Sequence, residues 1–316
     1  MANATPNRPG QVNGSGATDA LFEKIHTSEI LAAFEKRTKF RDKQQLKVIS
    51  HGKSASFPAT WRVTSGYHTP GTEILGESVN HNEVVITIDG KLLTSVFVDA
   101  LDDAMNHFDQ DSVYTTEMGR ELATQYDANV QRTIILAARA GAIVTGRPGG
   151  NNVQSATIAD SSANLKGGIF DAMQALAEDD VPTDDVIYAA FRPAEYFLMT
   201  QDTNLQNKDW GGTGSLADGT VLRVAGAQIL MSNNTSFGSD LSADASVHAK
   251  YQADYSVTRG IVWHPKSIGT VQLRGLMTRK VDDGRRDGYL FTAKYAVGHG
   301  HLMPEAAVEL RTGAPT

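Results

Sequence analysis

The stretch SVYTTEMGRELATQYDANVQRTIILAARA, residues 112–140, carries the strongest helical pattern in the chain. Its apolar side chains recur every four residues, which predicts one long helix. They are Tyr114, Met118, Leu122, Tyr126, Val130, Ile134 and Ala138. At 1.5 Å per residue this helix is roughly 40 Å long. Because a turn takes 3.6 residues, a four-residue repeat drifts about 40° per step, so the stripe winds around the helix. The pattern therefore predicts a spine that different partners cover along its length.

After this helix, helical and strand patterns alternate. The predicted order is a helix over 165–178, a strand over 184–191, a helix over 193–202 that starts with Pro193, and a strand–turn–strand over 218–234. We expect this segment to form a separate α/β lobe. Two long strands follow over 267–281 and 289–303, and a short one over 306–312. The chain is therefore expected to be of the α+β class.

Before the spine helix, an extended arm is predicted. Strand patterns at 55–63 (ASFPATWRV) and 81–89 (HNEVVITID) flank a connection rich in Gly and Pro. A two-stranded arm with a long tip buries too little surface to be stable alone. We therefore expect the tip to lie on a neighbouring chain. Its candidate contact residues are Tyr67, His68, Pro70 and Glu73.

The N-terminal region predicts a flexible tail over residues 1–19 and a helix over 18–37. A basic stretch follows, from Lys36 to Lys47. It is either a contact for nucleic acid or an acidic neighbour, or a solvated arm. Only Phe40 within it offers a ring for stacking on a base, which makes single-strand binding an unfavoured reading.

Composition excludes several classes of protein. The chain of 316 residues has no cysteine, which rules out disulfides, thiolate zinc sites and cysteine nucleophiles. The net charge of −7 does not favour sequence-independent binding to DNA phosphates. No apolar run reaches the ~20 residues of a membrane helix, and the first residues lack a signal-peptide pattern. We expect a chain that folds in a cytoplasm and contacts no membrane.

Motifs for chemistry are weak. The triplet GKS at 52–54 imitates the end of a phosphate-binding loop, but Lys47 stands where that motif needs glycine. His299 and His301 alternate on a predicted strand, and with Glu305 they form a candidate metal set. A hydrogen-bonded histidine pair is the favoured interpretation, because a metal site needs three or four ligands and supporting contacts. No catalytic residue, cofactor or metal is expected.

Five segments in order resemble one family. They are SHGKSASFPATWR (50–62), VITIDG (85–90), LDDAMNHFD (101–109), GTVQLRGL (269–276) and AKYAVGHGHLMPEAA (293–307). The chain is similar in these segments to the major capsid proteins of short-tailed, podovirus-type bacteriophages related to the T-seven group. The resemblance spans about residues 20–312 and implies the Hong Kong 97 (HK97-type) capsid fold.

The resemblance implies a role for each part of the chain. Residues 1–45 would be the tail and N-arm, 46–90 the E-loop, 91–145 with 262–316 the P-domain, and 146–261 the A-domain. The implied function is self-assembly into pentamers and hexamers of an icosahedral shell around double-stranded DNA, without sequence-specific binding. Implied partners are other copies, a separate scaffolding protein and a portal protein, with room for a decoration protein. The protein would assemble in the bacterial cytoplasm and reside in the virion.

The turn at 282–287 is a second candidate contact. It holds five charges in six residues, and the resemblance places it at three-fold contacts between capsomers. The charged residues are Asp282, Asp283, Arg285, Arg286 and Asp287. A solvated hairpin tip is the alternative. For the whole chain, a hydrolase or nucleotide-binding enzyme built on the 146–261 lobe competes with the capsid reading, and so does an adhesin or tail component.

Overall fold

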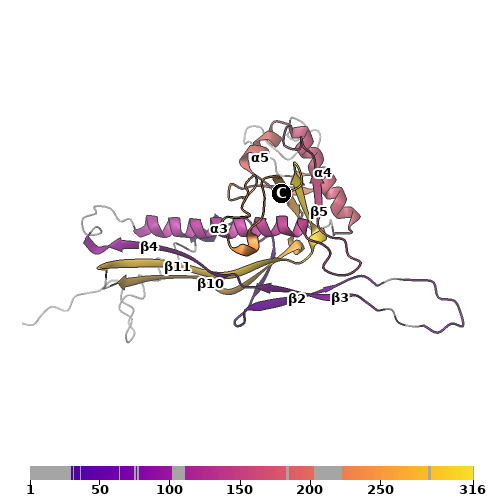
Figure 1. Cartoon of the computed structure of the whole chain (residues 1–316), viewed down its shortest axis with the longest axis horizontal. Coiled ribbons are helices and arrows are strands. Elements are labelled where there is room, and N and C mark those ends of the chain that lie inside the picture. Colours follow the sequence, from indigo (N-terminus) through magenta and orange to yellow (C-terminus); the bar gives the residue numbers. More distant parts are fainter. Residues whose placement is uncertain are drawn as a thin grey trace, which may run out of the picture. The chain divides into compact units, whose positions relative to one another are not determined.

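The computed structural model describes residues 30–315, except for Leu31, Lys36, Thr64, Leu75, Glu77, 102–110, Thr183, Asp184, 203–222, Gly284 and Arg285 (Figure 1). The chain divides into two units. Unit 1 holds residues up to 38 with 90–126 and 273–297, and unit 2 holds 39–89, 127–272 and the remainder from 298. Three elements run from one unit into the other: α3 (Asp111–Arg139), β10 (Ile268–Asp283) and β11 (Gly288–His301).

Unit 1 is built on β4 (Gly90–Asp99), which pairs antiparallel with β11 from Asp99↔Gly288 to Gly90↔Val297. The sheet order is β1-β10-β11-β4. Phe34 packs edge-on against Tyr126 of α3 at 5.9 Å and against Tyr295 of β11 at 5.6 Å. This aromatic group joins the helix to one face of the sheet. Gly119 lets the 30–35 segment approach, because a Cβ there would meet the Ile30 carbonyl oxygen at 2.6 Å.

Unit 2 is built on a six-stranded sheet of order β5-β12-β9-β6-β8-β7. The strands are β5 (Asn151–Gln154), β6 (Tyr188–Phe191), β7 (Arg223–Val224), β8 (Ala227–Met231), β9 (Thr258–Trp263) and β12 (Ala307–Arg311). The helices α4 (Ser162–Glu178) and α5 (Pro193–Thr200) pack with it through a core that includes Leu165, Ile169, Phe191, Val262 and Val308. The 3₁₀ turns η2 (Ala249–Tyr251), η3 (Pro265–Ser267) and η4 (Pro304–Ala306) complete the unit.

The arm also belongs to unit 2. Its strands β2 (Ser54–Thr60) and β3 (His81–Thr87) form an antiparallel ladder from Ser54↔Thr87 to Thr60↔His81. A small core of Ala55, Ile86, Val271 and Leu302 holds the base of this ladder. Beside it, β1 (Gln45–Val48) runs parallel to β10 at residues 269–272.

Most predicted elements are confirmed. The spine helix ends within one residue of its prediction, and α4, α5, β7–β8, β10, β11 and β12 lie where the patterns placed them. A further short strand lies between α3 and α4, because β5 begins at Asn151 and pairs with β12. The patterns gave no sign of β1, β4 or β9. Residues 1–29 of the predicted tail and first helix lie outside the described residues, whereas Ile30, 32–35 and Arg37 are helical.

Among the described helices, none combines the length and the apolar character needed to cross a bilayer.

Candidate assembly surfaces

The tip of the arm leaves apolar side chains in water. Beyond the Thr60↔His81 pair the β2–β3 ladder ends, and Figure 1 shows the connecting loop extending away from both strands. Tyr67 is fully exposed and Ile74 is 81% exposed. The predicted contact residues His68, Pro70 and Glu73 are exposed as well. Exposed apolar groups on an extended loop are typical of a segment that another chain covers.

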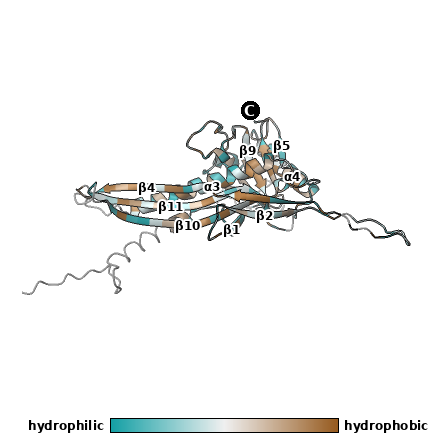
Figure 2. Ribbon diagram, turned by 60° about the horizontal axis from the view of Figure 1, so that its bottom comes forward, coloured by the Kyte–Doolittle hydropathy of each residue, from teal (hydrophilic) through white to brown (hydrophobic). Residues whose placement is uncertain are grey.

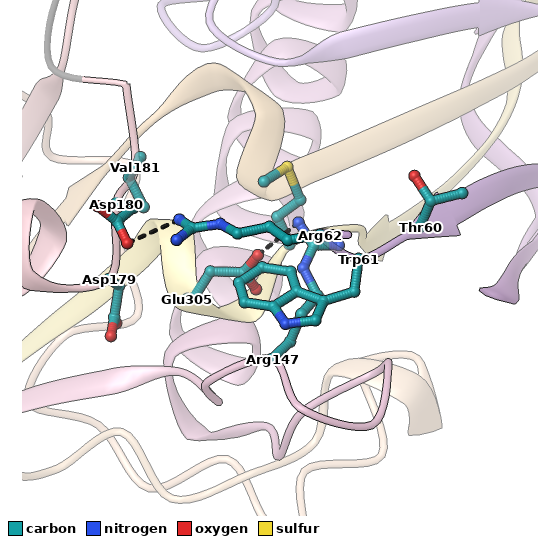
Figure 3. A pocket seen from close by; sticks show the side chains of 9 residues that line it. Thr60, Trp61, Arg62, Arg147, Asp179, Asp180, Val181 and Glu305 are labelled. Atoms are coloured by element: carbon teal, nitrogen blue, oxygen red, sulfur yellow. Dashed lines mark ion pairs between the residues drawn. The ribbon is translucent and has the colours of Figure 1, made fainter. Parts of the chain in front are cut away.

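The root of the arm, unlike its tip, makes specific contacts with other parts of unit 2. Trp61 follows β2, and the guanidinium groups of Arg62 and Arg147 lie 4.9 and 5.3 Å from its ring centroid. Arg62 pairs with Asp180 at 2.7 Å, and Arg147 pairs with Glu305 at 2.7 Å (Figure 3). These residues line a cavity of about 310 Å³ together with Thr60, Asp179, Val181 and Met303. Sequence patterns missed this cluster, because its members come from four separate segments.

The candidate metal set is not assembled. Glu305 pairs with Arg147, and burial raises the pKa of its carboxyl. The Nδ1 atom of His299 lies 2.7 Å from the Thr270 hydroxyl, which donates a hydrogen bond to Gln44 in turn. Within the described part of the chain, no three His, Cys, Asp or Glu side chains gather as metal ligands. His299 and His301 do lie on one strand, β11, as the spacing predicted.

A buried polar network lies at the base of β3. The Tyr251 hydroxyl donates a hydrogen bond to Asp89 and accepts one from the His299 main-chain N–H at 3.2 Å. Lys250 pairs with Asp89 at 3.0 Å. Burial raises the pKa of Tyr251 and lowers that of His299 to about 4. Both groups are therefore neutral at pH 7, and they act as hydrogen-bonding residues of the fold.

The buried His299 predicts a loss of stability in acid. Its imidazole titrates near 6.5 in the unfolded chain and near 4 in the folded one. Because the folded pKa is lower, the stabilisation is present above pH 6.5 and is lost as the pH falls towards 4. One histidine contributes about 3 kcal/mol across this range. Asp127 works in the opposite direction, since burial raises its pKa to about 6.

The measurement is urea unfolding of the wild type and of His299→Gln between pH 4 and 7. Subtracting the two curves of unfolding free energy against pH cancels the contributions of Asp127 and of every other group that both proteins share. We expect the stability difference between them to shrink as the pH falls. Parallel curves would show that His299 does not titrate differently in the folded and unfolded chains.

The predicted turn between β10 and β11 is described in part. Asp282, Arg286 and Asp287 are exposed, whereas Gly284, Arg285 and the side chain of Asp283 lie outside the described residues. Asp287 adopts a φ of 50°, and its carbonyl accepts a hydrogen bond from the Ala100 N–H at 3.0 Å. The described charges of the turn thus lie at the surface of unit 1.

One face of the sheet of unit 1 carries several exposed side chains, and Figure 2 colours its strands β4, β10 and β11 by hydropathy. The Lys280 ammonium lies over the rings of Tyr289 and Phe291, on the face of the sheet that carries Tyr295. Because side chains alternate along a strand, the residues of β10 on either side of Lys280 point to the opposite face. Cross-strand partners share a face, which joins Leu93 to Lys294 and Phe97 to Leu290. We call this surface the open sheet face; its exposed members are Lys91, Leu93, Ser95, Phe97, Met277, Arg279, Val281 and Lys294. It is apolar and basic.

The basic stretch before β1 makes contacts within its own unit. The ammonium groups of Lys39, Lys43 and Lys47 donate hydrogen bonds to the main-chain carbonyls of Met231, Lys39 and Ser56. The Asp127 carboxylate accepts from the Lys39 N–H at 3.0 Å. These contacts favour a structural role for this stretch over contact with nucleic acid.

The triplet at 52–54 lies at the start of strand β2 and does not open a helix, so the resemblance to a phosphate-binding loop is not supported by its structure. Lys53 uses its carbonyl to accept the Ile88 N–H at 2.9 Å.

Comparison with known proteins gives a consistent result. Residues 56–311 match the model of the Gp10A-like major capsid protein family. The chain is 28% identical to the major capsid protein of Escherichia phage T7, covering 95% of this chain and 94% of that protein. In the capsid structure of Cyanophage P-SCSP1u, a chain with 35% identity superposes with a TM-score of 0.79 over 99% of both chains. The mature capsid of bacteriophage PhiM1 shares the fold at 20% identity, with a TM-score of 0.74 over 88% of both chains.

The arm, the long helix and the two sheets therefore define a phage capsid subunit of the Hong Kong 97 type. The chain belongs to the Gp10A-like family of major capsid proteins. It is a structural protein of the virion that forms shells with copies of itself. The hydrolase or nucleotide-enzyme alternative is not supported, because the relatives are structural capsid proteins.

Proposed function

We propose that this major capsid protein forms pentamers and hexamers of an icosahedral shell, which encloses double-stranded DNA without reading its sequence. The observation that carries the proposal is the arm, whose ladder ends at Thr60↔His81 and whose tip exposes Tyr67 and Ile74. Such a tip gains stability only from another chain. As the family resemblance implies, assembly takes place in the bacterial cytoplasm with a scaffolding protein and a portal protein, and a decoration protein is a further partner.

The parts of the chain receive corresponding roles in this proposal. Residues 46–90 act as the E-loop that laps a neighbour, and 146–261 as the A-domain near the capsomer axes. Residues 91–145 with 262–316 act as the P-domain, and residues 1–45 as the tail and N-arm. The contact surfaces are heterologous, since the arm of one copy meets a different surface on the next copy. Heterologous contacts that close generate rings, as capsomers require.

The open sheet face is the proposed receptor for the arm tip. Residues 63–80 contain two glutamates and neither lysine nor arginine. The open sheet face exposes Leu93 and Phe97 beside Lys91 and Lys294. An acidic, apolar tip thus complements a basic, apolar face. Complementary charge favours correct encounter and disfavours wrong partners.

We expect Glu73→Lys to reduce the yield of closed shells, and Lys294→Glu to do the same, because each places like charges in contact. Combining the two reversals should restore part of the yield. The assay is particle yield by sedimentation after co-expression with a scaffolding protein, with circular dichroism as the folding control.

Glu83→Lys is the matched control for this test, since Glu83 is exposed on β3 but lies outside the tip. Hydrogen exchange of residues 65–74 should be protected in the shell and fast in the free subunit. Normal yields from both single reversals, or equal protection in the free subunit, would contradict the proposed contact. Rings or fibres in place of shells would instead indicate a tail component.

The β10–β11 turn is the proposed contact between capsomers. Asp282, Arg286 and Asp287 are exposed there, and arginine forms bidentate pairs with carboxylates. Each exposed pair contributes only ~0.2–1 kcal/mol, so the contact works through repetition over the shell. We expect Arg285→Glu with Arg286→Glu to leave the subunit folded and to block shell closure, with high salt acting partly in the same way. Shells at wild-type yield from the double variant would identify a solvated hairpin tip.

A further inference from the structure

Trp61 makes a backbone hydrogen bond between the two strands of the arm just beyond the end of their ladder. Its N–H donates to the Asn80 carbonyl at 3.1 Å, one residue beyond the Thr60↔His81 pair. Past this bond the chain enters the tip. The contacts of Trp61 and Asn80 therefore determine the direction in which the tip leaves the β2–β3 ladder.

Both strands of the arm are fastened at this level to the loop that follows α3. On the β3 side, the side-chain amide of Asn80 donates to the Thr145 carbonyl at 2.9 Å, and that of Asn82 donates to the Ile143 carbonyl at 2.5 Å. On the β2 side, the ring of Trp61 lies against Gly146, where a Cβ would come within 3.4 Å of two ring atoms. Gly146 also has a φ of 93°, which other residues rarely adopt.

Two ion pairs of different kinds hold the indole ring. Arg147, stacked on the ring, pairs with Glu305; their side chains are only 10% and 3% exposed. Arg62, also stacked on the ring, pairs with Asp180; their side chains are 54% and 62% exposed. Removing one partner of a buried pair leaves an uncompensated charge, whereas exposed pairs are weak and are screened by salt. The Arg147–Glu305 pair is therefore the more stable of the two, and the Arg62–Asp180 pair breaks more easily.

We infer that Trp61, Arg62, Arg147, Asp180 and Glu305 form a latch that sets the direction of the arm before a subunit meets its neighbour. Arg147–Glu305 keeps the root seated on unit 2. Arg62 reaches to Asp180 across the residues that line the cavity, and this pair restricts the tip to a narrow range of directions (Figure 3). Asp180 stands at the end of α4 with a φ of 55°, so the latch ties the arm to the lobe as well as to the α3 loop.

The latch reduces the number of arm orientations that a subunit samples before it binds a neighbour. An arm that swings freely would lose conformational entropy when it binds a neighbour, whereas a pre-set arm has already lost most of it. The inference rests on the proposed function for the purpose of the arm. The latch itself is measured in unassembled subunits, so its failure and the failure of the arm contact are separate results.

The test uses the full-length chain and the variants Arg62→Gln, Asp180→Asn and the two combined. Loss of an exposed pair should speed hydrogen exchange at the Trp61 N–H by about two- to fivefold. The double variant should exchange no faster than either single variant, because both changes break one interaction. About 1 M salt should bring the wild type towards the variants.

Arg120→Gln is the matched control, because Arg120 forms an equally exposed pair with Glu117, with side chains 53% and 61% exposed. This pair lies on α3, far in sequence from the residues of the arm. A second readout uses the absence of cysteine: spin labels on Thr72→Cys and Ala177→Cys report the spread of distances between tip and lobe. We expect Arg62→Gln to broaden that spread and Arg120→Gln to leave it unchanged. Wild-type exchange at Trp61 together with an unbroadened spread in Arg62→Gln would overturn the latch.

Discussion

Glu309→Ala is expected to lower the free energy of unfolding by about 3–5 kcal/mol, because it removes the counter-charge of Arg139, whose side chain is only 15% exposed. Glu309 is fully buried on β12 and accepts hydrogen bonds from Arg139 Nε at 2.8 Å and Nη2 at 2.6 Å. The Thr258 hydroxyl donates to the same carboxylate. Arg139 closes α3, and its Nη1 donates to the Asp254 carbonyl at 2.6 Å. The pair thus joins the end of the spine helix to the sheet of unit 2.

Urea unfolding followed by circular dichroism measures this loss. Glu178→Ala is the control, since Glu178 is exposed at the end of α4 and accepts a hydrogen bond from the side chain of Gln174. We expect the control to change stability by no more than about 0.5 kcal/mol. A loss below about 1 kcal/mol for Glu309→Ala would mean that water or a rearranged neighbour compensates Arg139.

Truncation of the spine helix stripe is the second change with a large expected effect. Ile134 and Leu122 are 0% and 1% exposed, as their place on the four-residue repeat predicted. Replacing either with Ala removes a buried side chain and leaves a cavity, which costs about 2–5 kcal/mol. Val113→Ala, at an exposed position of the same helix, is the control. The measurements are the yield of soluble subunit and its urea unfolding, and wild-type values for both buried variants would contradict the packing of the stripe.

The sequence predicted elements whose signal is local. The repeat from Tyr114 to Ala138 located α3 closely, and the Gly/Pro-rich connection located the tip of the arm. It did not reveal which strands pair. β12 lies between β5 and β9, although about 150 residues separate it from β5, and no local pattern encodes such a pairing.

The same limit applies to the candidate surfaces. The exposure of Tyr67, His68, Pro70 and Glu73 could be predicted because exposed turns have a compositional signature, whereas their contact with another chain stays a prediction. The sequence patterns did not predict the latch, because none of its residues belongs to a local motif and the residues come together only in the folded chain. Trp61 at the end of a predicted strand, with Arg62 next to it, was the one local signal available. The spacing of Glu305 from His299 and His301 suggests a metal ligand, whereas its actual partner, Arg147, lies 158 positions earlier in the chain.

The place of β12 has a consequence for the order of events during synthesis. β5 and β9 are both made before β12. In the sheet as described, β5 pairs with β12 alone and β9 pairs with β12 and β6, so β5 has no neighbouring strand and β9 has one until residues 307–311 are made. At about 5–20 residues per second, β5 waits roughly ten to thirty seconds on the ribosome for that strand. Arg139 waits equally long for Glu309. A chain cut short before residue 307 would lack an interior strand of its larger sheet, so it would not form a finished subunit.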